Sequence, residues 1–301
     1  MTSLPAIRQT AGPGAARAAR RRLTYTSEGR RPGWPTYAIL GAVIIVSAYP
    51  LYYTFLLGAS TAPQIARNPI PSALPGGNFW DNAGRVLASD IHFWRAIVNS
   101  IIVSALTAAS VVFFATLAGF SFAKLRFRGR RGLLMFVVAT MAVPTQLSVV
   151  PLFIVMAKLG LQGTLTAVIL PGAVTAFGVF WMTQYLEAAL PFELIEAARV
   201  DGCSMIRTFW HVALPAARPA AAMLSLFTFV ATWTNFFWPF VVLSQANPTI
   251  TVATQLLQAS FFKDYSLVMA GVAMATAPLL ILFAVAGKQL VSGIMHGAVK
   301  G

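Results

Sequence analysis

The polar segment 196–202, Glu-Ala-Ala-Arg-Val-Asp-Gly, concentrates charge in a chain that is otherwise strongly apolar. Four of the eight acidic residues, Glu187, Glu193, Glu196 and Asp201, lie in this segment or just before it. Carboxylates beside an arginine can form charge-assisted hydrogen bonds with another protein. We therefore interpret the segment as a binding element.

The sequence does not support catalysis or metal binding. His92, His211 and His296 are far apart, and no His, Asp, Ser or Cys residues cluster at catalytic spacing. The single cysteine, Cys203, excludes an internal disulfide. The chain also lacks the phosphate-binding sequence G-x-x-x-x-G-K-[ST]. We expect no metal, no cofactor and no ATP hydrolysis by this chain alone, and therefore no enzyme.

A second stretch, Trp-Thr-Asn-Phe-Phe-Trp-Pro at 233–239, places aromatic rings and an amide inside an apolar run. Aromatic faces stack on the C–H surfaces of sugars, and amides hydrogen-bond hydroxyl groups. Trp233, Asn235, Phe236 and Trp238 are therefore candidates for contact with a neutral polyol. The alternative is an aromatic belt at the outer membrane interface followed by a proline kink.

Composition places both segments in a membrane protein. Of the 301 residues, 57% are apolar and 10% are charged, whereas soluble domains carry about 25% charged residues. The apolar runs are continuous and about 20 residues long, which is enough to cross a hydrocarbon core of about 30 Å as helices. Because hydrocarbon leaves backbone groups no water to bond, these runs must form helices. We predict an all-α integral membrane protein.

Six apolar runs are predicted to be transmembrane helices. They cover approximately residues 36–57, 96–123, 132–156, 165–185, 219–243 and 268–290. The polar segments 59–95 and 244–265 are expected to be loops outside the membrane, and 291–301 a short tail.

The N-terminal residues 1–33 hold seven arginines against one acid and too few apolar residues to fold. We predict a disordered basic cytoplasmic tail followed by a membrane domain at 34–301. A signal peptide is the alternative. However, the first apolar run is too long for one, and no small-residue cleavage site follows it.

The basic residues predict the orientation of the spans. The net charge is +14, and seventeen of the 22 lysines and arginines fall on one side of the predicted membrane, which marks that side as cytoplasmic. Both termini and the loop at 186–215 are therefore expected in the cytoplasm. This placement also argues against nucleic-acid binding. The run 124–131 holds five positive charges; an anionic-lipid patch is conceivable there, but a short cytoplasmic hairpin is the simpler interpretation.

Local signals predict two short helices in the loop at 186–215. Pro191 suits the first position of a helix, and Glu193 in the first turn favours the helix dipole. Gly202 ends this helix with a positive φ, and Ser204 caps the next one. Pro215 marks the break before the fifth span.

The second of these helices should be amphipathic, with Ile206, Phe209, Trp210 and Ala213 on one apolar face. Its aromatic residues would then project below the membrane with charges around them. An interfacial helix lying on the lipid is the alternative to a docking element for a cytoplasmic partner.

The loop pattern E-A-A-x-x-D-G-x(11)-L-P resembles the cytoplasmic signature of ABC-importer permeases. Its positions here are Glu196, Ala197, Ala198, Asp201, Gly202, Leu214 and Pro215. Other segments are similar to the carbohydrate-type branch of this family. Within that branch they are most similar to the second permease of the pair, which is equivalent to the smaller maltose-importer permease. These segments are 99–103, 124–131, 143–144, 170–171, 177–178 and 297–301.

The resemblance implies a type I ABC-importer (MetI-like) permease fold with both termini cytoplasmic, in a multi-pass protein of the bacterial plasma (inner) membrane surrounded by lipid. It implies a heterodimer with a second permease, two ATPase subunits and an extracytoplasmic solute-binding protein or lipoprotein. The implied cargo is a sugar or oligosaccharide, with glycerol 3-phosphate or a related phosphorylated polyol as the alternative.

The resemblance also assigns roles to residues of this chain. Loop residues that would couple the spans to the ATPase are Glu196, Ala197, Ala198, Arg199, Asp201, Gly202, Leu214 and Pro215. The C-terminal residues Val299, Lys300 and Gly301 would also contact the ATPase. A side chain at Gly202 would clash or remove the turn, so Gly202→Asp is expected to uncouple transport from ATP without removing the protein from the membrane.

Three positions depart from the family pattern. Cys203 stands where a small residue such as alanine is usual. In the fifth-span motif, Thr234 replaces the usual asparagine and Asn235 the usual acid. A secondary transporter acting alone is a competing hypothesis, but its spans would carry acids for ion coupling, and these spans carry none.

Overall fold

The computed structural model describes residues 33–68, 70, 72–261 and 264–298, with side chains described up to residue 287. All regular elements in these ranges are helical, which agrees with the predicted all-α class. The predicted basic tail lies outside the described residues except for Gly33, and so do Val299, Lys300 and Gly301.

The chain divides into two compact units, Met1–Pro50 and Leu51–Gly301. Helix α2 (Trp34–Gly58) crosses this boundary and matches the first predicted span. Its 25 residues correspond to about 37 Å at 1.5 Å per residue, which is long enough to cross a bilayer core.

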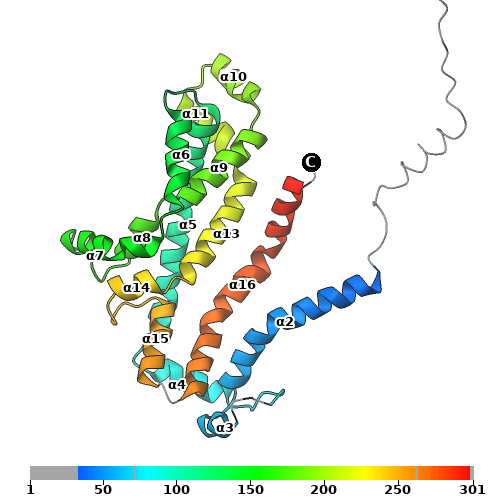
Figure 1. The fold of residues 1–301 in the computed structure, drawn as a ribbon, viewed down its shortest axis with the longest axis vertical. Coiled ribbons are helices and arrows are strands. Elements are labelled where there is room, and N and C mark those ends of the chain that lie inside the picture. The colour runs from blue at the N-terminus through cyan, green and yellow to red at the C-terminus, as the bar shows by residue number, and fades with distance from the viewer. Residues whose placement is uncertain (1–32, 69, 71, 262–263, 299–301) are drawn as a thin grey trace, which may run out of the picture. The chain divides into compact units, whose positions relative to one another are not determined.

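The second unit is an assembly of helices joined by short connections (Figure 1). Its helices are α3 (Ala62–Arg67), α4 (Phe79–Ala88), α5 (Phe93–Lys124), α6 (Arg130–Thr140), the 3-10 turn η1 (Thr145–Ser148), α7 (Val149–Lys158), α8 (Thr166–Gly172), α9 (Ala176–Ala189), α10 (Phe192–Val200), α11 (Met205–Thr208), the π-helical turn η2 (Phe209–Ala213), α12 (Leu214–Ala216), α13 (Arg218–Trp233), α14 (Phe237–Val242), α15 (Ile250–Ser260) and α16 (Tyr265–Ala298).

By length and composition, α2, α5 and α16 are each able to cross a membrane as single helices. Three further pairs qualify only as bent spans: α6 with η1 and α7 at 88°, α8 with α9 at 44°, and α11–α12 with α13 at 75°. The described residues therefore hold three clear spans, and up to six if each bent pair is counted as one.

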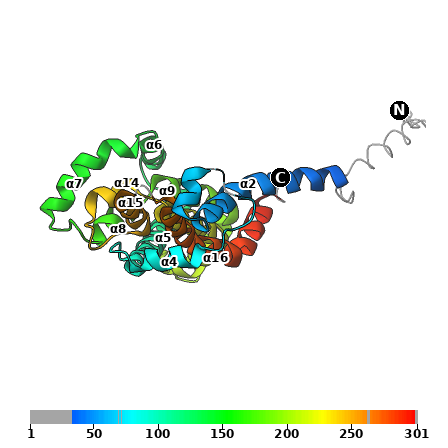
Figure 2. The same cartoon turned by 90° about the horizontal axis from the view of Figure 1, so that it is seen from below.

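The third and fourth predicted spans, 132–156 and 165–185, are not the continuous helices that the apolar runs suggested. The third is interrupted after Thr140, where Pro144 precedes the turn η1. The fourth ends its first helix at Gly172, directly after Pro171. Proline lacks a backbone N–H and crowds the residue before it, so it favours a break at these positions. Figure 2 shows α6 and α7 arching away from α5 and α8.

The segment 244–265, predicted to be an outer loop, is not irregular, because α15 forms within it. Ile250, Ala253 and Leu257 of α15 are buried in one cluster with Leu267 and Ala270 of α16. The predicted loop at 59–95 contains α3 and α4, and the predicted C-terminal tail is helical as far as Ala298.

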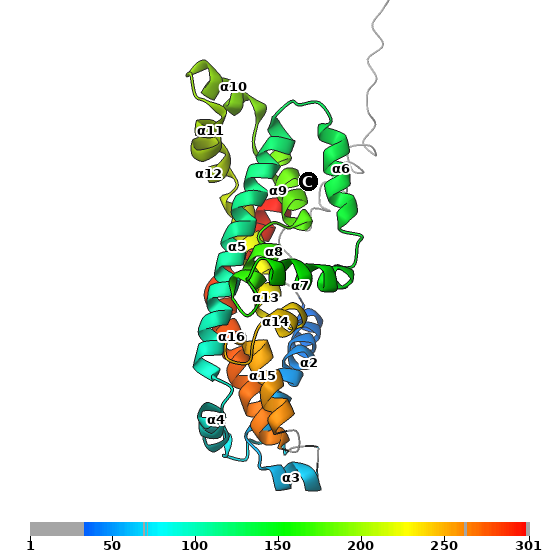
Figure 3. The same ribbon diagram turned by 90° about the vertical axis from the view of Figure 1, so that its left-hand side faces the viewer.

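The long helix α5 packs against α9 and α13 (Figure 3). Its core with these helices includes Val111, Ala115, Phe120, Met182, Leu186 and Leu224. The α5–α9 approach is close at Gly119, where an added Cβ would lie 2.7 Å from Cβ of Met182. Such small residues let membrane helices pack backbone to backbone.

Polar contacts join the elements at the end of this unit that contains α4. Asn99 Nδ2 on α5 donates to Asn247 Oδ1 at 2.9 Å and to the carbonyl of Pro248 at 2.8 Å. Arg85 on α4 pairs with Asp264, just before α16, at 2.7 Å. Burial acts to raise the pKa of Asp264, but hydrogen bonds from Ser266, Arg85 and the backbone, together with the charge of Arg85, outweigh it and lower that pKa.

Candidate functional site

The helices α10 to α12 form a compact loop at the end of the second unit opposite α4 (Figures 1 and 3). Helix α10 begins after Pro191, which takes the capping position rather than the predicted first helical position. Glu193 lies in its first turn and Arg199 in its last. Both charges complement the helix dipole, so local sequence chemistry sets the limits of this helix.

The turn after α10 is a Schellman motif centred on Gly202, whose φ is 74°. The Cys203 N–H donates to the Ala198 carbonyl at 2.8 Å, and the Gly202 N–H donates to the Arg199 carbonyl at 3.0 Å. This pattern satisfies the last carbonyls of a helix and needs a left-handed residue. The predicted positive φ is therefore confirmed.

The prediction of a clash at Gly202 was wrong for this chain by itself. A Cβ added there would meet no atom within 4 Å. What restricts the position is the left-handed backbone, which costs an L-residue about 1–2 kcal/mol. The open space beside Gly202 leaves the turn accessible.

The second helix of the loop starts as predicted but does not continue as predicted. The Ser204 hydroxyl accepts from the Arg207 N–H at 3.3 Å, which is the expected cap. After a single α-helical turn, the backbone becomes π-helical over η2. The wider i→i+5 turn changes the angular spacing of the side chains.

The four residues of the predicted apolar face do not share one environment. Phe209 and Ala213 are 3% and 0% exposed, whereas Ile206 and Trp210 are 72% and 50% exposed. Phe209 and Ala213 pack into the unit, Ile206 is largely exposed, and Trp210 is half-exposed at the edge of the packed surface. The loop is thus an anchored element with an exposed apolar surface, not a helix with one buried stripe.

Phe209 attaches the loop to α5. Its ring centroid lies 6.0 Å from that of Phe120 and 6.4 Å from that of Phe113. Trp210 also approaches Phe113, at 6.1 Å. Because aromatic rings bury large apolar areas, Phe209 is the main hydrophobic anchor of this segment.

Helix α10 divides its signature residues between two faces. Ile195 and Ala198 are buried against the unit, while Glu196, Ala197, Arg199 and Asp201 are exposed. Leu214 and Pro215, after η2, are half-buried. Within the described residues no ion pair involves the three charged members of this set. The exposed face can therefore pair with charges of another chain.

The basic hairpin 124–131 lies beside this loop. The sequence did not predict this proximity. Lys124 Nζ donates to the Glu187 carbonyl at 3.2 Å. The Arg126 guanidinium lies 5.5 Å from the centroid of the Phe192 ring at the start of α10. A separation of more than 60 residues leaves no local signal for these contacts. The first contact connects the end of α5 to α9, and the second connects the hairpin to α10, both independently of Phe209.

The four aromatic and amide candidates of the fifth span do not converge on one site. The span is broken between α13 and α14. Trp233 is buried and stacks on Phe229 with ring centroids 5.9 Å apart, whereas Trp238 donates from Nε1 to the Ala167 carbonyl of α8 at 3.0 Å. Phe236 stacks on Phe240. Asn235 is exposed, and its carbonyl accepts from Thr251 Oγ1 at 2.9 Å.

A pocket of about 290 Å³ lies next to this break. It is lined by Trp233 and Thr234, by Ile250, Thr251 and Thr254 of α15, and by Val272, Ala275, Thr276 and Leu279 of α16. None of these residues is charged. Trp233 is the one predicted candidate in this lining. The sequence did not indicate the other residues, because they come from distant segments and each is ordinary for an apolar helix.

The four threonine hydroxyls of this pocket are already used as donors. Each donates to a backbone carbonyl: Thr234 to Val230, Thr251 to Asn235, Thr254 to Thr251 and Thr276 to Val272. A hydroxyl that donates once keeps acceptor lone pairs. The threonine pocket, defined by these four residues and Trp233, can therefore accept hydrogen bonds from a ligand's hydroxyl groups.

Residues 112–289 match the family model described as "Binding-protein-dependent transport system inner membrane component". The chain is 31% identical to the arabinooligosaccharides transport system permease protein AraQ of Halalkalibacterium halodurans, over 86% of this chain and 93% of that protein. It is 30% identical to the lactose transport system permease protein LacG of Rhizobium radiobacter, over 91% and 99% respectively.

One further relative and one solved structure are also similar to this chain. The sn-glycerol-3-phosphate transport system permease protein UgpE of Brucella abortus is 27% identical, over 86% of this chain and 93% of that protein. A chain of a bacterial ABC transporter involved in the import of the acidic polysaccharide alginate superposes with a TM-score of 0.70 at 24% identity, covering 88% of this chain and 98% of that chain. At this identity the superposition shows a shared fold.

Proposed function

The chain belongs to the family of inner-membrane components of binding-protein-dependent transport systems, and we propose that its α10–α12 loop couples partner ATPase subunits to its membrane helices. It is a sugar-type ABC-importer permease of the bacterial plasma membrane, a class of transport subunit that is not itself an enzyme. The observation that carries the proposal is the combination of an exposed charged face on α10 with a buried anchor at Phe209.

This arrangement suits the transfer of motion. A partner that binds Glu196, Arg199 or Asp201 would pull on α10, whose other face is packed against the unit. The pull would reach α5 through Phe209 and through the Arg126–Phe192 contact. Charge-assisted hydrogen bonds are strong enough to hold such a partner.

We further propose six spans with both termini and the loop in the cytoplasm, in a heterodimer with a second permease. Two ATPase subunits and an extracytoplasmic binding protein would complete the complex. The distribution of basic residues supports this orientation. Helix α16 runs toward the end of the unit that holds α10 (Figure 1). This direction supports a role for Val299, Lys300 and Gly301 at the same ATPase.

The turn at Gly202 provides the test of coupling. Gly202→Val should lower uptake per ATP hydrolysed severalfold, because a β-branched residue is strained at a φ of 74°. Gly202→Asn is the matched control, since asparagine tolerates this conformation. The rate of uptake and the rate of ATP hydrolysis would be measured for each variant with the complete transporter in proteoliposomes. Wild-type coupling in the valine variant, with normal assembly, would refute the proposed role of the turn.

For the cargo, we propose a neutral sugar or oligosaccharide that passes the threonine pocket. Its lining offers hydroxyl acceptors and an indole but no cation, whereas a phosphate group calls for lysine or arginine. The relatives named for arabinooligosaccharide and lactose transport agree with a neutral cargo. The glycerol-3-phosphate relatives keep a phosphorylated polyol as the second candidate.

Removing two pocket acceptors should impair uptake of a neutral sugar. The double variant Thr254→Val with Thr276→Val is expected to lower kcat/KM for uptake about tenfold, because each lost hydrogen bond contributes about 0.5–1.5 kcal/mol. Thr183→Val is the control, since Thr183, like Thr276, donates to the carbonyl four residues before it but lies buried in α9, outside this pocket. If the double variant took up the sugar as well as Thr183→Val does, the threonine pocket would be excluded from the pathway.

A further inference from the structure

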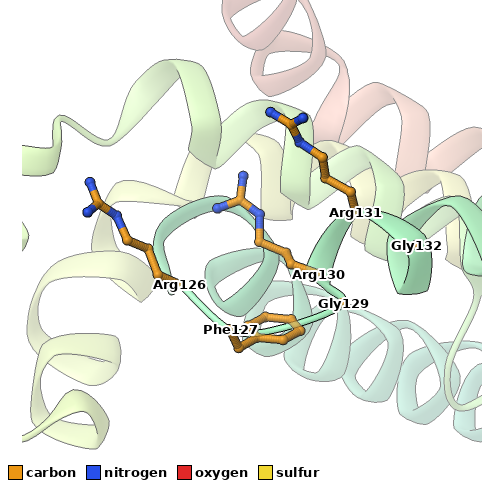
Figure 4. A pocket seen from close by; sticks show the side chains of 6 residues that line it. All are labelled: Arg126, Phe127, Gly129, Arg130, Arg131 and Gly132. Carbon is orange, nitrogen blue, oxygen red and sulfur yellow. The ribbon is translucent and has the colours of Figure 1, made fainter.

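The hairpin between α5 and α6 gathers three arginines around an open pocket of about 370 Å³. Its lining residues are Arg126, Phe127, Gly129, Arg130, Arg131 and Gly132. Figure 4 shows the side chains of the three arginines extending to the same side of the hairpin, with the Phe127 ring at its base. We call this the arginine pocket.

The positive charge of the arginine pocket is not neutralised by this chain. No acidic residue lines it, and among the described residues the ion pairs do not include any of its arginines. Arg130 Nη1 donates to the Leu125 carbonyl at 3.3 Å, and Arg126 lies over Phe192. A guanidinium has five N–H donors, so most donors remain open to an anion.

The surface that follows the pocket along α6 is apolar and uncovered. Leu133, Met135 and Phe136 are 49%, 73% and 66% exposed, and α6 has no buried residue. The cationic pocket therefore opens at the start of an exposed hydrophobic helix. A ligand that satisfies both features must combine an anionic head with an apolar body.

We propose that the arginine pocket binds the phosphate headgroup of an anionic phospholipid whose acyl chains lie along α6. Arginine recognises phosphate through paired N–H donors. Basic pockets between helices on the cytoplasmic side of a membrane are suited to acidic headgroups. A soluble phosphate would use the arginines but leave the apolar surface of α6 uncovered.

Occupancy of this site would also act on the coupling loop. Arg126 belongs to the arginine pocket and contacts Phe192 of α10. A bound headgroup would hold the Arg126 guanidinium in place and would thereby stabilise the position of α10 against the end of α5. This consequence rests on the proposed coupling function, whereas lipid binding itself does not.

The test measures lipid retained by the complete transporter after purification from nanodiscs of phosphatidylcholine containing phosphatidylglycerol. The triple variant R126K/R130K/R131K keeps every charge but loses the paired donors. We expect it to retain about tenfold less phosphatidylglycerol than wild type. Arg128→Lys is the control, because Arg128 is in the same hairpin but does not line the pocket. The single variant R130K and a size-exclusion profile check that any loss is not caused by misassembly.

Four results would overturn the proposal. Equal retention by wild type and the triple variant would exclude the site, and an equal loss in Arg128→Lys would reduce it to unspecific charge. Displacement of the lipid by millimolar inorganic phosphate would show that the acyl chains contribute nothing. Weaker ATPase association with unchanged lipid would assign the arginines to the protein partner. Gly202→Val should retain lipid normally, so failure of the coupling proposal is distinguishable.

Discussion

Replacing Phe209 with alanine is expected to leave ATP hydrolysis in the assembled transporter but to abolish most of the uptake that depends on it. The ring is 3% exposed and packs on Phe113 and Phe120 of α5. Truncating a buried phenylalanine costs about 3–5 kcal/mol. Because η2 has few other buried side chains, this loss should detach the loop from α5 locally.

Amide hydrogen exchange over residues 205–217 is the direct measurement of that detachment. Protection should fall in Phe209→Ala and remain in Trp210→Ala, because Trp210 is half-exposed and its neighbour keeps the anchor. Uptake and ATP hydrolysis are measured in the same preparations. Normal exchange together with normal uptake in Phe209→Ala would show that the loop does not transmit motion through this ring.

Substituting Gly119 by leucine should have the largest effect on folding. A Cβ at this position would lie 2.7 Å from Cβ of Met182 and 2.9 Å from the backbone nitrogen of Thr183. The backbone of α9 cannot rotate away as a side chain can, so α5 and α9 must separate. Overpacking typically costs about 1–3 kcal/mol, and a clash with backbone atoms places this substitution at the upper end, because α5 and α9 pack closely on each other.

Gly84→Leu provides the matched control for this substitution. Gly84 is also helical, but an added Cβ there meets no atom within 4 Å. Leucine has a higher helix propensity than glycine, by just under ~1 kcal/mol. Thermal unfolding of the two variants in detergent, followed by fluorescence-detected size exclusion, should show a lower Tm for Gly119→Leu and an unchanged or higher Tm for Gly84→Leu. Equal Tm values would mean that the α5–α9 contact can relax.

Signals that act within a few residues predicted the loop well. The helix at α10, the positive φ of Gly202 and the Ser204 cap follow from the chemistry of their own neighbours. The limits of α2 and α5 likewise follow from their apolar runs. These features depend on backbone hydrogen bonds and hydropathy, which each segment carries by itself.

Features that join distant segments were not predicted. The predicted loop at 244–265 did not reveal that α15 would bury Leu257 against α16. The spacing of Ile206 and Phe209 suggested one apolar face, but Ile206 is exposed and Phe209 is buried. An apolar side chain can face lipid, a partner protein or the core of its own chain. Composition alone therefore does not distinguish among these environments.

The sequence by itself determined that this is a helical membrane protein with a charged loop turning at Gly202, and its motifs indicated an ABC-importer permease. Only the tertiary structure decided that Phe209 anchors that loop, that threonines of α15 and α16 share a pocket with the end of α13, and that Arg126 reaches α10. The physical reason is the range of the interactions. Capping and hydropathy are properties of one segment, whereas burial and pocket geometry arise only when helices distant in sequence pack together.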